Sequence, residues 1–502
     1  MKILNAAQIR EVDRLSIERE PVSSTDLMER AAVRAWEIIK TVAAENKAPI
    51  LVVCGTGNNG GDGLVIARKA QECNFNVQCI VVSADKSPEG SPDFKINLQR
   101  LKETGVSLHI AASPPDTIDL FPNTIIIDAL FGTGLSRPAE GIYEIWIKWM
   151  NASGLKTISI DIPSGLFSDD PRTDVPIVQA QYTLTFGCMK FSFVFPESAR
   201  FCGFVYCIDI GWDAKAVAEQ DSNYHFIQAE DLASLLKPID PFAYKNTRGH
   251  VLISGGSKGM YGAPMLSAKA AFRVGAGLVS VHVPQRAETI VHQSLPDALC
   301  VSDEEENYLS RFPKAHKFHS LAIGMGMGAN SEQVLKQAII EFGGPIVIDA
   351  DALRYLSENL TWMSFLPKGC VLTPHPGEMA NLLKSKNFRL NDVVDFAVKH
   401  MVYINLKGSF SALITPTAKV FFNGTGTSAL AVAGTGDVLS GMIAGFLAQG
   451  YSTVESVLLG NGLHGLAGQL AAKKLDITSV TASDVIEHVG IAIRNLRSLQ
   501  IT

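Results

Sequence analysis

Two glycine-rich segments hold the residue types with which this sequence could do chemistry. The first, "GTGNNGGDGL" (55–64), follows an apolar run and leaves two asparagines and one aspartate among its glycines. Glycine loses more freedom on folding than any other residue, so a run of it indicates that something approaches the backbone closely. The segment matches G-x-G-x-x-G, but it lacks the acidic residue that a dinucleotide fingerprint carries about 20 positions later. A tight turn therefore stays open beside a dinucleotide site.

Two aspartates stand where later apolar runs end. Asp128 closes "IIID" before "LFGTGLSRP", and Asp161 closes "ISID" before "IPSG". Because ligands bind outside the carboxyl ends of parallel strands, we expect these aspartates and the first glycine segment to face one crevice. Asn59, Asp128 and Ser164 would offer oxygen atoms without a histidine or cysteine, which favours a hard monovalent cation over zinc or Ca²⁺. Each aspartate could instead cap a helix.

The first-half segments "GTGNNGGDGL", "DALFGTGLSRP" and "SIDIPSGL" resemble the NAD(P)H-hydrate epimerase family. The resemblance implies a Rossmann-like domain that binds hydrated NAD(P)H and K⁺. Asn59, Asp128 and Ser164 would hold the ion, and Asp161 would contact the nicotinamide ring as the candidate catalytic acid or base. The substrate-lining residues that the resemblance implies are Asn58, Asn59, Gly60, Gly61, Asp62, Gly132, Thr133, Gly134, Leu135, Ser136, Arg137, Pro138 and Asp161.

The second glycine-rich segment, "VAGTGDVLSG" (432–441), places small residues and then Asp437 at the expected start of a helix. Backbone amides at such a position bind an anion. They would stabilise charge on a moving phosphoryl group while the carboxylate accepts a hydroxyl proton. The alternative is a glycine-rich helix cap, but Asp437 would then repel the anion that the amides attract. The motif GxxxxGK[ST] does not occur, which excludes a P-loop nucleotidase.

Three further segments of the second half carry polar side chains near expected strand ends. "LKGSFS" (406–411) offers a lysine and two hydroxyl groups for a nucleotide phosphate, although a solvated lysine is the alternative. "TPHPGEM" (373–379) encloses His375 between two prolines and is expected to line the substrate, since no second histidine nearby supports a metal site. "DADAL" (349–353) could stabilise its own loop and receives no role.

These segments resemble the ribokinase-like superfamily. The resemblance extends to "GGSKGMYGAPMLSAKAAFRVGAGLVSV" and "IGMGMG" before them and to "AGTGDVLSGMIAGFLAQG" after them. Within it they resemble the ADP- or ATP-dependent NAD(P)H-hydrate dehydratases, which implies Asp437 as the catalytic residue and Mg²⁺ with ADP as co-substrate. The implied substrate-binding residues are Ala263, Gly326, Thr373, Pro374, His375, Pro376, Gly377, Glu378, Met379 and Asp437. The implied nucleotide-binding residues are Lys407, Gly408, Ser409, Phe410, Ser411, Thr427, Gly434, Thr435 and Gly436.

One departure from the dehydratase pattern concerns the nucleotide. The family usually reads Gly-Gly-Thr-Gly-Asp after Pro-Gly-Met-Ala-Thr, whereas "SALAVAGTGD" has Ala433 and lacks that proline and glycine. The choice between ATP and ADP therefore stays open.

Together the two resemblances imply a bifunctional repair enzyme. It would interconvert the R and S epimers of hydrated NAD(P)H and dehydrate the S epimer to NAD(P)H, converting ADP to AMP and phosphate. One alternative is a small-molecule kinase of the ribokinase type, whose product keeps the phosphate; "TPHPGE" speaks against it. The other is a non-catalytic dinucleotide sensor in the first half, against which the intact Asn59, Asp128 and Asp161 speak.

The elements that position these residues alternate along the chain. The apolar runs that predict strands are 49–54, 77–82, 124–130, 157–162, 182–187, 203–211, 249–256, 278–284, 320–326, 345–351, 369–375 and 402–408. They are apolar on both faces, which is typical of parallel strands covered by helices. Asp26 with Glu29 resembles a capping box, Pro264 is expected to start a helix, and a glycine-rich helix is expected after Gly436.

A polar stretch at 212–225 separates the two series of runs and predicts a linker. The expected organisation is α/β throughout: a Rossmann-like epimerase domain at 1–220 and a ribokinase-like, ADP-dependent dehydratase domain at 221–502.

Composition agrees with a soluble enzyme that acts on small molecules. Of 502 residues, 47% are hydrophobic and 19% charged, and the net charge of −6 gives no support for nucleic-acid or membrane partners. The eight cysteines show no CxxC spacing, and the start "MKILNAAQIREVDR" lacks the apolar core of a signal peptide. We therefore expect buried reduced thiols and a cytoplasmic protein. The resemblances imply NAD(P)HX and ADP as its partners, and we also expect a homo-oligomer.

Overall fold

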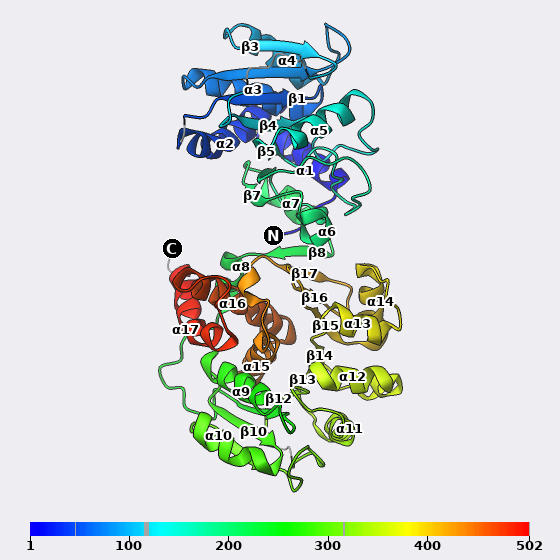
Figure 1. Ribbon diagram of the computed structural model, residues 1–502, viewed down its shortest axis with the longest axis vertical. Coiled ribbons are helices and arrows are strands. Elements are labelled where there is room, and N and C mark those ends of the chain that lie inside the picture. Colours follow the sequence, from blue (N-terminus) through cyan, green and yellow to red (C-terminus); the bar gives the residue numbers. More distant parts are fainter. Residues whose placement is uncertain (46, 115–119, 315–316, 501–502) are drawn as a thin grey trace. The chain divides into compact units, whose positions relative to one another are not determined.

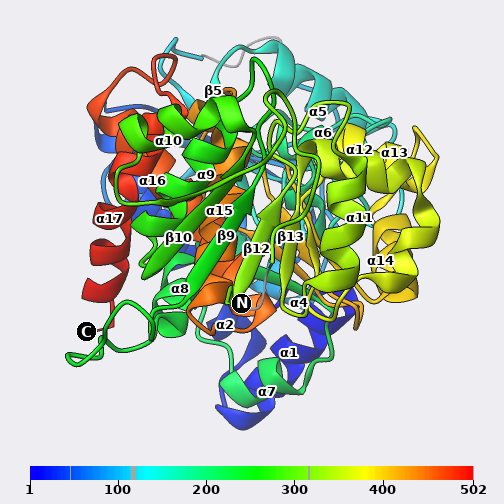
Figure 2. The same ribbon diagram turned by 90° about the horizontal axis from the view of Figure 1, so that it is seen from below.

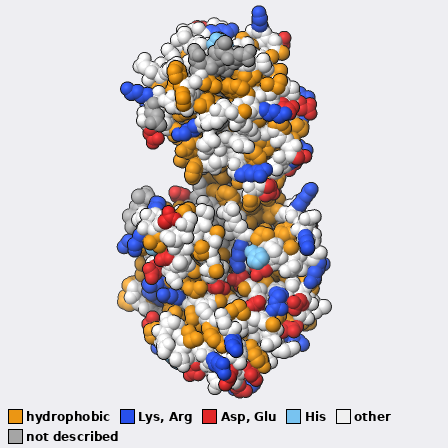
Figure 3. All heavy atoms as spheres, in the orientation of Figure 1, with side chains coloured by type: hydrophobic (Ala, Val, Ile, Leu, Met, Phe, Trp, Pro, Cys, Tyr) orange, Lys and Arg blue, Asp and Glu red, His pale blue; other side chains and the backbone are white. Residues whose placement is uncertain are grey.

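The computed structural model describes residues 1–502 apart from 46, 115–119, 315–316 and 501–502, and it divides into two compact α/β units (Figure 1). The first unit is Lys2–Ser222, and the second is Asn223–Thr502 together with Met1. None of the helices in the described part combines the length and apolar character that a membrane span needs. On the face shown in Figure 3, acidic and basic side chains are interspersed.

Seven parallel strands form the sheet of the first unit, in the order β3-β2-β1-β4-β5-β6-β7. They are β1 (Ile50–Cys54), β2 (Val77–Val82), β3 (Ser107–Ala111), β4 (Ile125–Ala129), β5 (Lys156–Ile160), β6 (Tyr182–Phe186) and β7 (Phe204–Ile208). The strand order reverses between β1 and β4, and ligands bind at the carboxyl ends of the strands beside such a reversal. The predicted Rossmann-like arrangement is confirmed.

Helices cover both faces of this sheet because its central strand is apolar on both sides. Val52 and Cys54 pack in one cluster with residues of α2 and α3, whereas Leu51 and Val53 pack on the other face with Trp146 of α5. The helices are α1 (Ala6–Arg19), α2 (Ser24–Ala44), α3 (Asn58–Glu72), α4 (Pro92–Lys102), α5 (Ile142–Ala152), α6 (Pro196–Ala199) and α7 (Ala214–Glu219), with the 3-10 turn η1 (Phe191–Val194).

Two sequence predictions about elements of the first unit are wrong. Helix α2 is capped by Ser23, whose Oγ accepts a hydrogen bond from the Asp26 amide at 3.0 Å, so Asp26 lies inside the helix. The boundary between the two units falls inside the predicted linker 212–225, after Ser222, but the stretch is structured: it contains α7 and the start of β8 (Tyr224–Ile227), and its Trp212 donates to Asp13 at 2.7 Å. Polar composition alone did not separate a short capped helix from a linker.

Ten strands form the sheet of the second unit, in the order β11-β10-β9-β12-β13-β14-β15-β16-β17-β8. Figure 2 shows β10, β9, β12 and β13 side by side. Neighbouring strands are parallel except at the β15–β16 and β16–β17 pairs, which are antiparallel. The strands not yet given are β9 (His250–Ser254), β10 (Leu278–Val283), β11 (Leu299–Ser302), β12 (Ser320–Ile323), β13 (Ile346–Ile348), β14 (Val371–Leu372), β15 (Tyr403–Leu406), β16 (Ala412–Ile414) and β17 (Val420–Asn423).

The helices of the second unit begin close to the predicted positions. Helix α9 starts at Gly262, two residues before Pro264, and α15 starts at Thr435, just before Gly436. The helices are α8 (Ala229–Leu235), α9 (Gly262–Arg273), α10 (Glu288–Ser294), α11 (Glu332–Glu341), α12 (Ala350–Glu358), α13 (Pro376–Leu383), α14 (Leu390–His400), α15 (Thr435–Ala448), α16 (Thr453–Lys474) and α17 (Ala482–Ser498). The 3-10 turns are η2 (Gln285–Ala287), η3 (Leu360–Phe365) and η4 (Ser428–Leu430).

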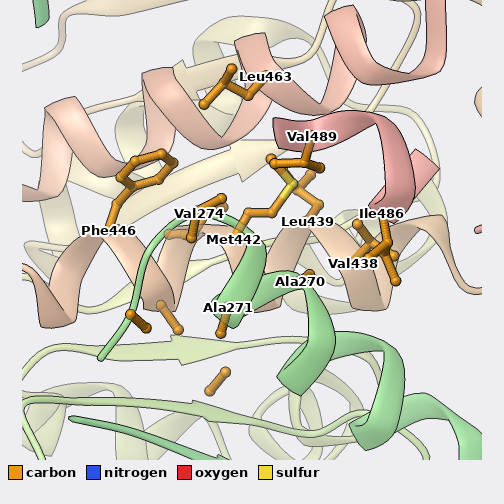
Figure 4. Close-up of a cluster of buried hydrophobic side chains, with 14 of the residues drawn as sticks. Ala270, Ala271, Val274, Val438, Leu439, Met442, Phe446, Leu463, Ile486 and Val489 are labelled. Atoms are coloured by element: carbon orange, nitrogen blue, oxygen red, sulfur yellow. The ribbon is translucent and has the colours of Figure 1, made fainter. Parts of the chain in front are cut away.

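The core of the second unit holds α15 in place from several sides. Met442 and Phe446 of α15 pack in one cluster with Ala271 of α9 and Val489 of α17 (Figure 4). Helices α9 and α15 approach so closely at Gly441 that a Cβ atom there would lie 2.0 Å from the Ser267 carbonyl oxygen. The amino end of α15, which carries Asp437, is thereby held rigidly.

Candidate active sites

A cleft of about 750 Å³ opens in the first unit, between α1, α2 and the loops that follow β1, β4 and β5. Most of the residues predicted to bind substrate in this half line it: Asn58, Asn59, Asp62, Gly132, Thr133, Gly134, Leu135, Ser136, Arg137 and Asp161. Gly60, Gly61 and Pro138 do not line it. The prediction that these strand ends share one crevice agrees with the geometry for the first glycine segment and Asp161, whereas Asp128 and Ser164 are buried and do not line the cleft.

The glycines of the first segment serve packing as much as binding. A Cβ atom on Gly60 would lie 1.8 Å from the Gly55 carbonyl oxygen, and one on Gly55 would lie 2.1 Å from the Leu130 carbonyl oxygen. At Gly63, a Cβ atom would meet the Ala129 side chain at 2.7 Å. The start of α3 can approach β1 and β4 only because these side chains are missing.

Asp161 is the centre of the polar part of this cleft. Its backbone adopts φ +65°, a strained conformation for a residue with a side chain, and such strain gathers at functional sites. Its Oδ1 pairs with Lys190 Nζ at 3.1 Å, and its Oδ2 accepts a hydrogen bond from the Thr133 amide at 3.1 Å. Lys190 also donates to the carbonyl oxygens of Phe186 and Cys188.

Lys190 is a buried cation that lines the cleft. Its side chain is 1% exposed; burial lowers the pKa of its ammonium group, but the charge and hydrogen bond of Asp161, together with Cys188 and Cys207, outweigh burial, and the net shift is upward. Lys190 therefore carries its positive charge against Asp161 throughout the physiological pH range. The sequence offers no motif around Lys190 that would have identified it.

Burial raises the pKa of two further carboxyl groups of the cleft. Burial, together with the charge of Asp161, raises the pKa of Asp62 well above its ordinary value. Burial raises the pKa of Asp13 to about 6, although its hydrogen bond from Trp212 opposes the shift. Sequence reasoning missed Asp13 and Trp212 because they come from α1 and from the segment after β7. The cleft thus combines an ion-paired carboxylate with carboxyl groups that can hold a proton.

Asp128, a predicted cation ligand, lies fully buried below the cleft. Its Oδ1 accepts from Ser164 Oγ at 2.6 Å and its Oδ2 from Ser159 Oγ at 2.7 Å, while the amides of Leu130 and Ser164 donate to the same carboxyl group. Burial raises its pKa in spite of these hydrogen bonds. The carboxyl group ties the loops after β4 and β5 together.

The other two predicted cation ligands, Asn59 and Ser164, are both hydrogen-bonded to the backbone of Phe131, and Ser164 is also hydrogen-bonded to Asp128. Asn59 Nδ2 donates to the Phe131 carbonyl oxygen at 2.8 Å, and the Phe131 amide donates to Ser164 Oγ at 2.9 Å. Asn59 Oδ1 is buried and has no hydrogen-bond partner among the described residues. An unsatisfied buried oxygen is costly, so this atom calls for a donor or a cation. The oxygen-only set fits a hard cation such as K⁺.

A second cleft, of about 690 Å³, lies in the second unit at the amino end of α15. Predicted residues that line it are Ala263, Gly326, His375, Glu378, Gly434 and Asp437. Sequence reasoning missed other lining residues, among them Met260, Asp351, Arg354 and Asn381. Thr373 and Met379 are buried in the core, and neither they nor Pro374, Pro376 and Gly377 line the cleft.

Asp437 lies in the first turn of α15, three residues after the residue that turns the chain into the helix. That residue, Gly434, has φ +89°, which favours glycine, and the backbone oxygen of Asp437 accepts from Ser267 Oγ at 2.7 Å. Among the described residues, no hydrogen bond reaches the Asp437 carboxyl group. Burial, with the charge of Asp349 adding to it and that of Lys407 opposing it, raises its pKa to about 6. It can therefore accept a proton near neutral pH.

The loop before α13 presents His375 in one tautomer. Its Nδ1 accepts hydrogen bonds from the amides of Gly377 and Glu378 at 3.0 and 3.3 Å, so the neutral ring carries its proton on Nε2. Glu378 in return accepts from the His375 amide at 2.8 Å, and burial raises the pKa of Glu378. The predicted substrate loop is thus a capped helix start whose His375 faces the cleft.

The predicted nucleotide-binding residues belong to two neighbouring segments. Lys407 directly follows β15 and pairs with Asp349 at 2.6 Å, which rules out the alternative of a solvated lysine. A Cβ atom on Gly436 would lie 3.3 Å from Lys407 Nζ, so the lysine stands beside the amino end of α15. Gly408, Ser409, Phe410 and Ser411 form the turn from β15 to β16, Thr427 caps η4, and Gly434 and Thr435 open α15.

Comparison with known proteins covers nearly the whole chain. The family model for YjeF-related protein N-terminus matches residues 24–192, and the model for NAD(P)H-hydrate dehydratase matches residues 251–490. The bifunctional NAD(P)H-hydrate repair enzyme Nnr of Moorella thermoacetica is 33% identical over 99% of this chain and 97% of that protein. The enzyme of the same name from Thermofilum pendens is 31% identical over 99% and 97%, and that from Escherichia coli is 29% identical over 96% and 92%.

Solved structures are similar to the second unit. The ADP/ATP-dependent NAD(P)H-hydrate dehydratase from Bacillus subtilis, co-crystallised with ATP and Mg²⁺, is 25% identical, covers 54% of this chain and 98% of its own, and gives a TM-score of 0.48. A ribokinase-like superfamily protein from Enterococcus faecalis is 24% identical, covers 55% of this chain and 98% of its own, and gives a TM-score of 0.49.

Proposed function

We propose roles for the two clefts from the premise that this chain belongs to the bifunctional NAD(P)H-hydrate repair enzymes, which its similarity over nearly the whole length shows. It is an enzyme with isomerase and lyase activities, and it repairs hydrated NADH and NADPH by epimerisation and dehydration. Which residues carry each step is the proposal. The first unit would be the epimerase and the second the ADP-dependent dehydratase.

In the second unit, Asp437 would act as the base of phosphoryl transfer. The observation that carries this proposal is its carboxyl group, which faces the cleft without a hydrogen-bond partner among the described residues and has a pKa of about 6. It would take the proton of the ring hydroxyl as that oxygen attacks the terminal phosphorus of ADP and the bond to the AMP oxygen breaks. The amides at the start of α15 and the Lys407 ammonium group would stabilise the phosphoryl charge.

Dehydration would then follow by elimination. Hydroxide leaves poorly, whereas the phosphorylated oxygen leaves as phosphate when its bond to the ring carbon breaks. Loss of a proton from the neighbouring ring carbon completes the double bond of NAD(P)H, so the products are NAD(P)H, AMP, phosphate and a proton. Mg²⁺ would accompany the nucleotide and neutralise its phosphates, since it binds proteins mainly through carboxylates and substrate phosphates. His375 and Glu378 line the same cleft and would orient the nicotinamide ring.

In the first unit, Asp161 would exchange a proton with the hydrated ring. Its ion pair with Lys190 and the hydrogen bond from Thr133 direct its carboxyl group, while Asp62 and Asp13 can hold the complementary proton. Carboxyl groups that lie close together in different environments are typical of acid–base sites.

K⁺ would bind beside this group, with Asn59 Oδ1 as the available ligand and Asp128 and Ser164 completing the oxygen set. It would supply a fixed positive charge near the substrate. The three side chains already lie in one hydrogen-bonded group, which supports a common site.

The decisive test of the activity is a product assay with mixed epimers of hydrated NADH. Incubation with ADP and Mg²⁺ is expected to restore the NADH absorbance and to release one AMP and one phosphate per NADH formed. A kinase of the ribokinase type would instead give a phosphorylated product without the absorbance of NADH, and that outcome would refute the proposal. Repeating the assay with ATP decides the nucleotide preference that Ala433 leaves open.

Assembly into a homo-oligomer and cytoplasmic location are part of the same proposal and are supported by the family resemblance alone. Light scattering on the eluting protein measures the mass, and fractionation of the source cells measures the location.

A further inference from the structure

Asp349 occupies a buried position where three elements of the second unit meet. It follows β13 and caps α12, where its Oδ1 accepts from the Ala350 amide at 2.9 Å. The same oxygen accepts from Lys407 Nζ at 2.6 Å, at the end of β15, and Oδ2 accepts from Ser440 Oγ at 2.6 Å, on α15. Its side chain is 2% exposed. One carboxylate thus connects α12, β15 and α15.

The backbone around Asp349 is strained to reach this arrangement. Ala350 has φ +49°, a conformation that residues with a side chain rarely adopt. Gly324, with φ +127°, lies so close that a Cβ atom there would stand 1.8 Å from the Asp349 carbonyl oxygen. Strain of this kind persists where the surrounding structure demands it and gathers at functional sites.

The contact with Asp349 restricts where the Lys407 charge can lie. A free lysine side chain samples many rotamers, and ordering it costs about 1.5–2 kcal/mol. Here Lys407 Nζ is held between Asp349 and the amino end of α15, beside Gly436. Ser440, one turn beyond Asp437 on the same helix, anchors the other carboxylate oxygen. The ammonium group therefore stands ready where a phosphoryl group bound to the amides of α15 would lie.

Asp349 also places negative charge near the base. Its charge adds to burial in raising the pKa of both Asp437 and Glu378. The charged and titratable groups around Asp437 are Asp349 after β13, Asp351 and Arg354 on α12, His375 and Glu378 at the start of α13, Lys407 after β15 and His464 on α16. Of these, Asp349 and Lys407 are the two that shift Asp437.

We infer that Asp349 is a positioning residue of the dehydratase, which holds Lys407 against the phosphoryl site and keeps a negative charge near Asp437. This inference rests on the proposed function of the second cleft. It accounts for "DADAL", to which the sequence alone assigns no role.

The test is the full-length variant Asp349→Asn, which keeps the shape and removes the charge. We expect kcat for the S epimer at pH 8 to fall about 10- to 100-fold, because a displaced catalytic group costs this much. The dissociation constant for ADP, measured by calorimetry, should rise because Lys407 is no longer held. The acid limb of kcat/KM should move about one pH unit lower, since a like charge beside Asp437 is gone.

A matched control is Asp303→Asn, which removes another buried carboxylate of the same unit. Asp303 accepts from Ser310 Oγ at 2.6 Å and pairs with His282 at 3.5 Å, outside the cleft. The variant Asp303→Asn should have the same acid limb and the same ADP affinity as the wild type. If Asp349→Asn matches the wild type in kcat, ADP affinity and acid limb, the inference is refuted. A shift of the same size in Asp303→Asn refutes it too.

Two provisions keep the test decisive. If Asp349→Asn does not fold, Ser440→Ala takes its place, because it removes the anchoring hydroxyl group but keeps the charge of Asp349. The dissociation constant for ADP should then rise about fivefold while the acid limb stays in place. An unchanged dissociation constant refutes the inference. A wild-type protein that gives no NADH from the S epimer with ADP would instead refute the proposed function, which separates the two failures.

Discussion

At the scale of single residues, the two clefts use carboxyl groups in different ways. Asp161 is ion-paired with a buried lysine and strained in its backbone, so its position and charge are set by its surroundings. Asp437 has no hydrogen-bond partner among the described residues and a pKa of about 6, so it is free to take up a proton. The first arrangement suits reversible proton exchange, and the second suits a base that acts once in each phosphoryl transfer.

Asp437→Asn is expected to abolish dehydration with little loss of stability, because the shape is kept and the base is lost. Removal of a positioned base costs about 10² to 10⁴ in rate. Conversion of the S epimer with ADP, followed by NADH absorbance, measures the loss, while the melting temperature and the epimerase rate serve as controls. Turnover like that of the wild type in the folded variant would contradict the assignment.

The acid limb of the dehydratase follows from the same residue. The reaction needs the carboxylate form, so kcat/KM should be level above about pH 7 and fall about tenfold per pH unit below the pKa of about 6. The sign follows from the raised pKa, since at pH 5 most of Asp437 is protonated. Initial rates from pH 5 to 9 measure this limb, and the residual rate of Asp437→Asn should lack it. An acid limb near pH 4 would contradict a buried base.

Asn59→Ala should separate ion binding from folding. It removes the unsatisfied Oδ1 and one hydrogen bond to Phe131, so we expect the K⁺ concentration for half-maximal epimerisation to rise about tenfold, with a loss of stability of about 1 kcal/mol. Dehydration of the S epimer should be unaffected. Titration of the epimerase with KCl against a bulky organic cation measures the effect.

Asp128→Ala is the comparison variant for the ion site. It leaves Ser159 and Ser164 without their acceptor, so it should weaken K⁺ binding and also destabilise the first unit by about 1–3 kcal/mol. An epimerase rate that ignores both variants and the replacement of K⁺ would remove the ion from the proposal.

At the scale of elements, the amino end of α15 is positioned by its packing against α9. The two helices touch at Gly441, where no side chain fits, and Met442 and Phe446, which follow it on α15, fill the core with residues of α9 and α17 (Figure 4). Asp437 lies one turn before this contact, so the packing sets the direction of its side chain. In the first unit, the glycines at the start of α3 play the same part against β1 and β4.

Gly441→Ala should therefore impair the dehydratase through the helix contact. The added Cβ atom would meet the Ser267 carbonyl oxygen at 2.0 Å, and such overpacking costs about 1–3 kcal/mol. We expect a lower melting temperature of the second unit and a lower kcat for dehydration. The matched control is Gly490→Ala on α17, where no atom lies within 4 Å of the added Cβ and the helix should gain up to about 1 kcal/mol. Equal melting temperatures of the two variants would contradict this account.

At the scale of the whole molecule, each unit holds a complete cleft formed by its own elements. The residues of the first cleft all fall within Lys2–Ser222, and those of the second within Asn223–Thr502. The two reactions of the repair are therefore expected to proceed independently and to be linked by a free intermediate.

Mixing two full-length variants tests this independence. Asp161→Asn with ADP should convert the S part of an epimer mixture quickly. The R part should then be converted only as fast as it epimerises spontaneously to S. Addition of Asp437→Asn, which cannot dehydrate, should bring the conversion to completion at the fast rate. The rate of the slow phase before and after the addition is the measured quantity, and the double variant is the control. If Asp161→Asn alone shows no slow phase, Asp161 has no part in epimerisation. A slow phase that the addition does not accelerate would mean that the first unit is not an epimerase or that the reactions are not separable.

The sequence by itself determined the fold class and the positions of both clefts. Asn59, Asp161 and Asp437 follow strands or open helices within short motifs, and the carboxyl ends of neighbouring parallel strands meet at one edge of a sheet. These features depend on residues close together in the chain, so a local pattern is enough to find them. The predictions at 212–225 and at the cap of α2 went wrong because they used residue types alone, and residue types do not show which side chain caps a helix.

Only the tertiary structure decided which distant side chains complete the clefts. Lys190 reaches Asp161 from a loop after β6, Asp13 comes from α1, and Asp349 meets Lys407 and Ser440 across separations of 58 and 91 residues. Such meetings depend on strand order and helix packing, which no short motif encodes. Burial, which raises the pKa of Asp437 and Asp62, likewise arises only when the whole chain closes around them, since desolvation is a property of the folded surroundings.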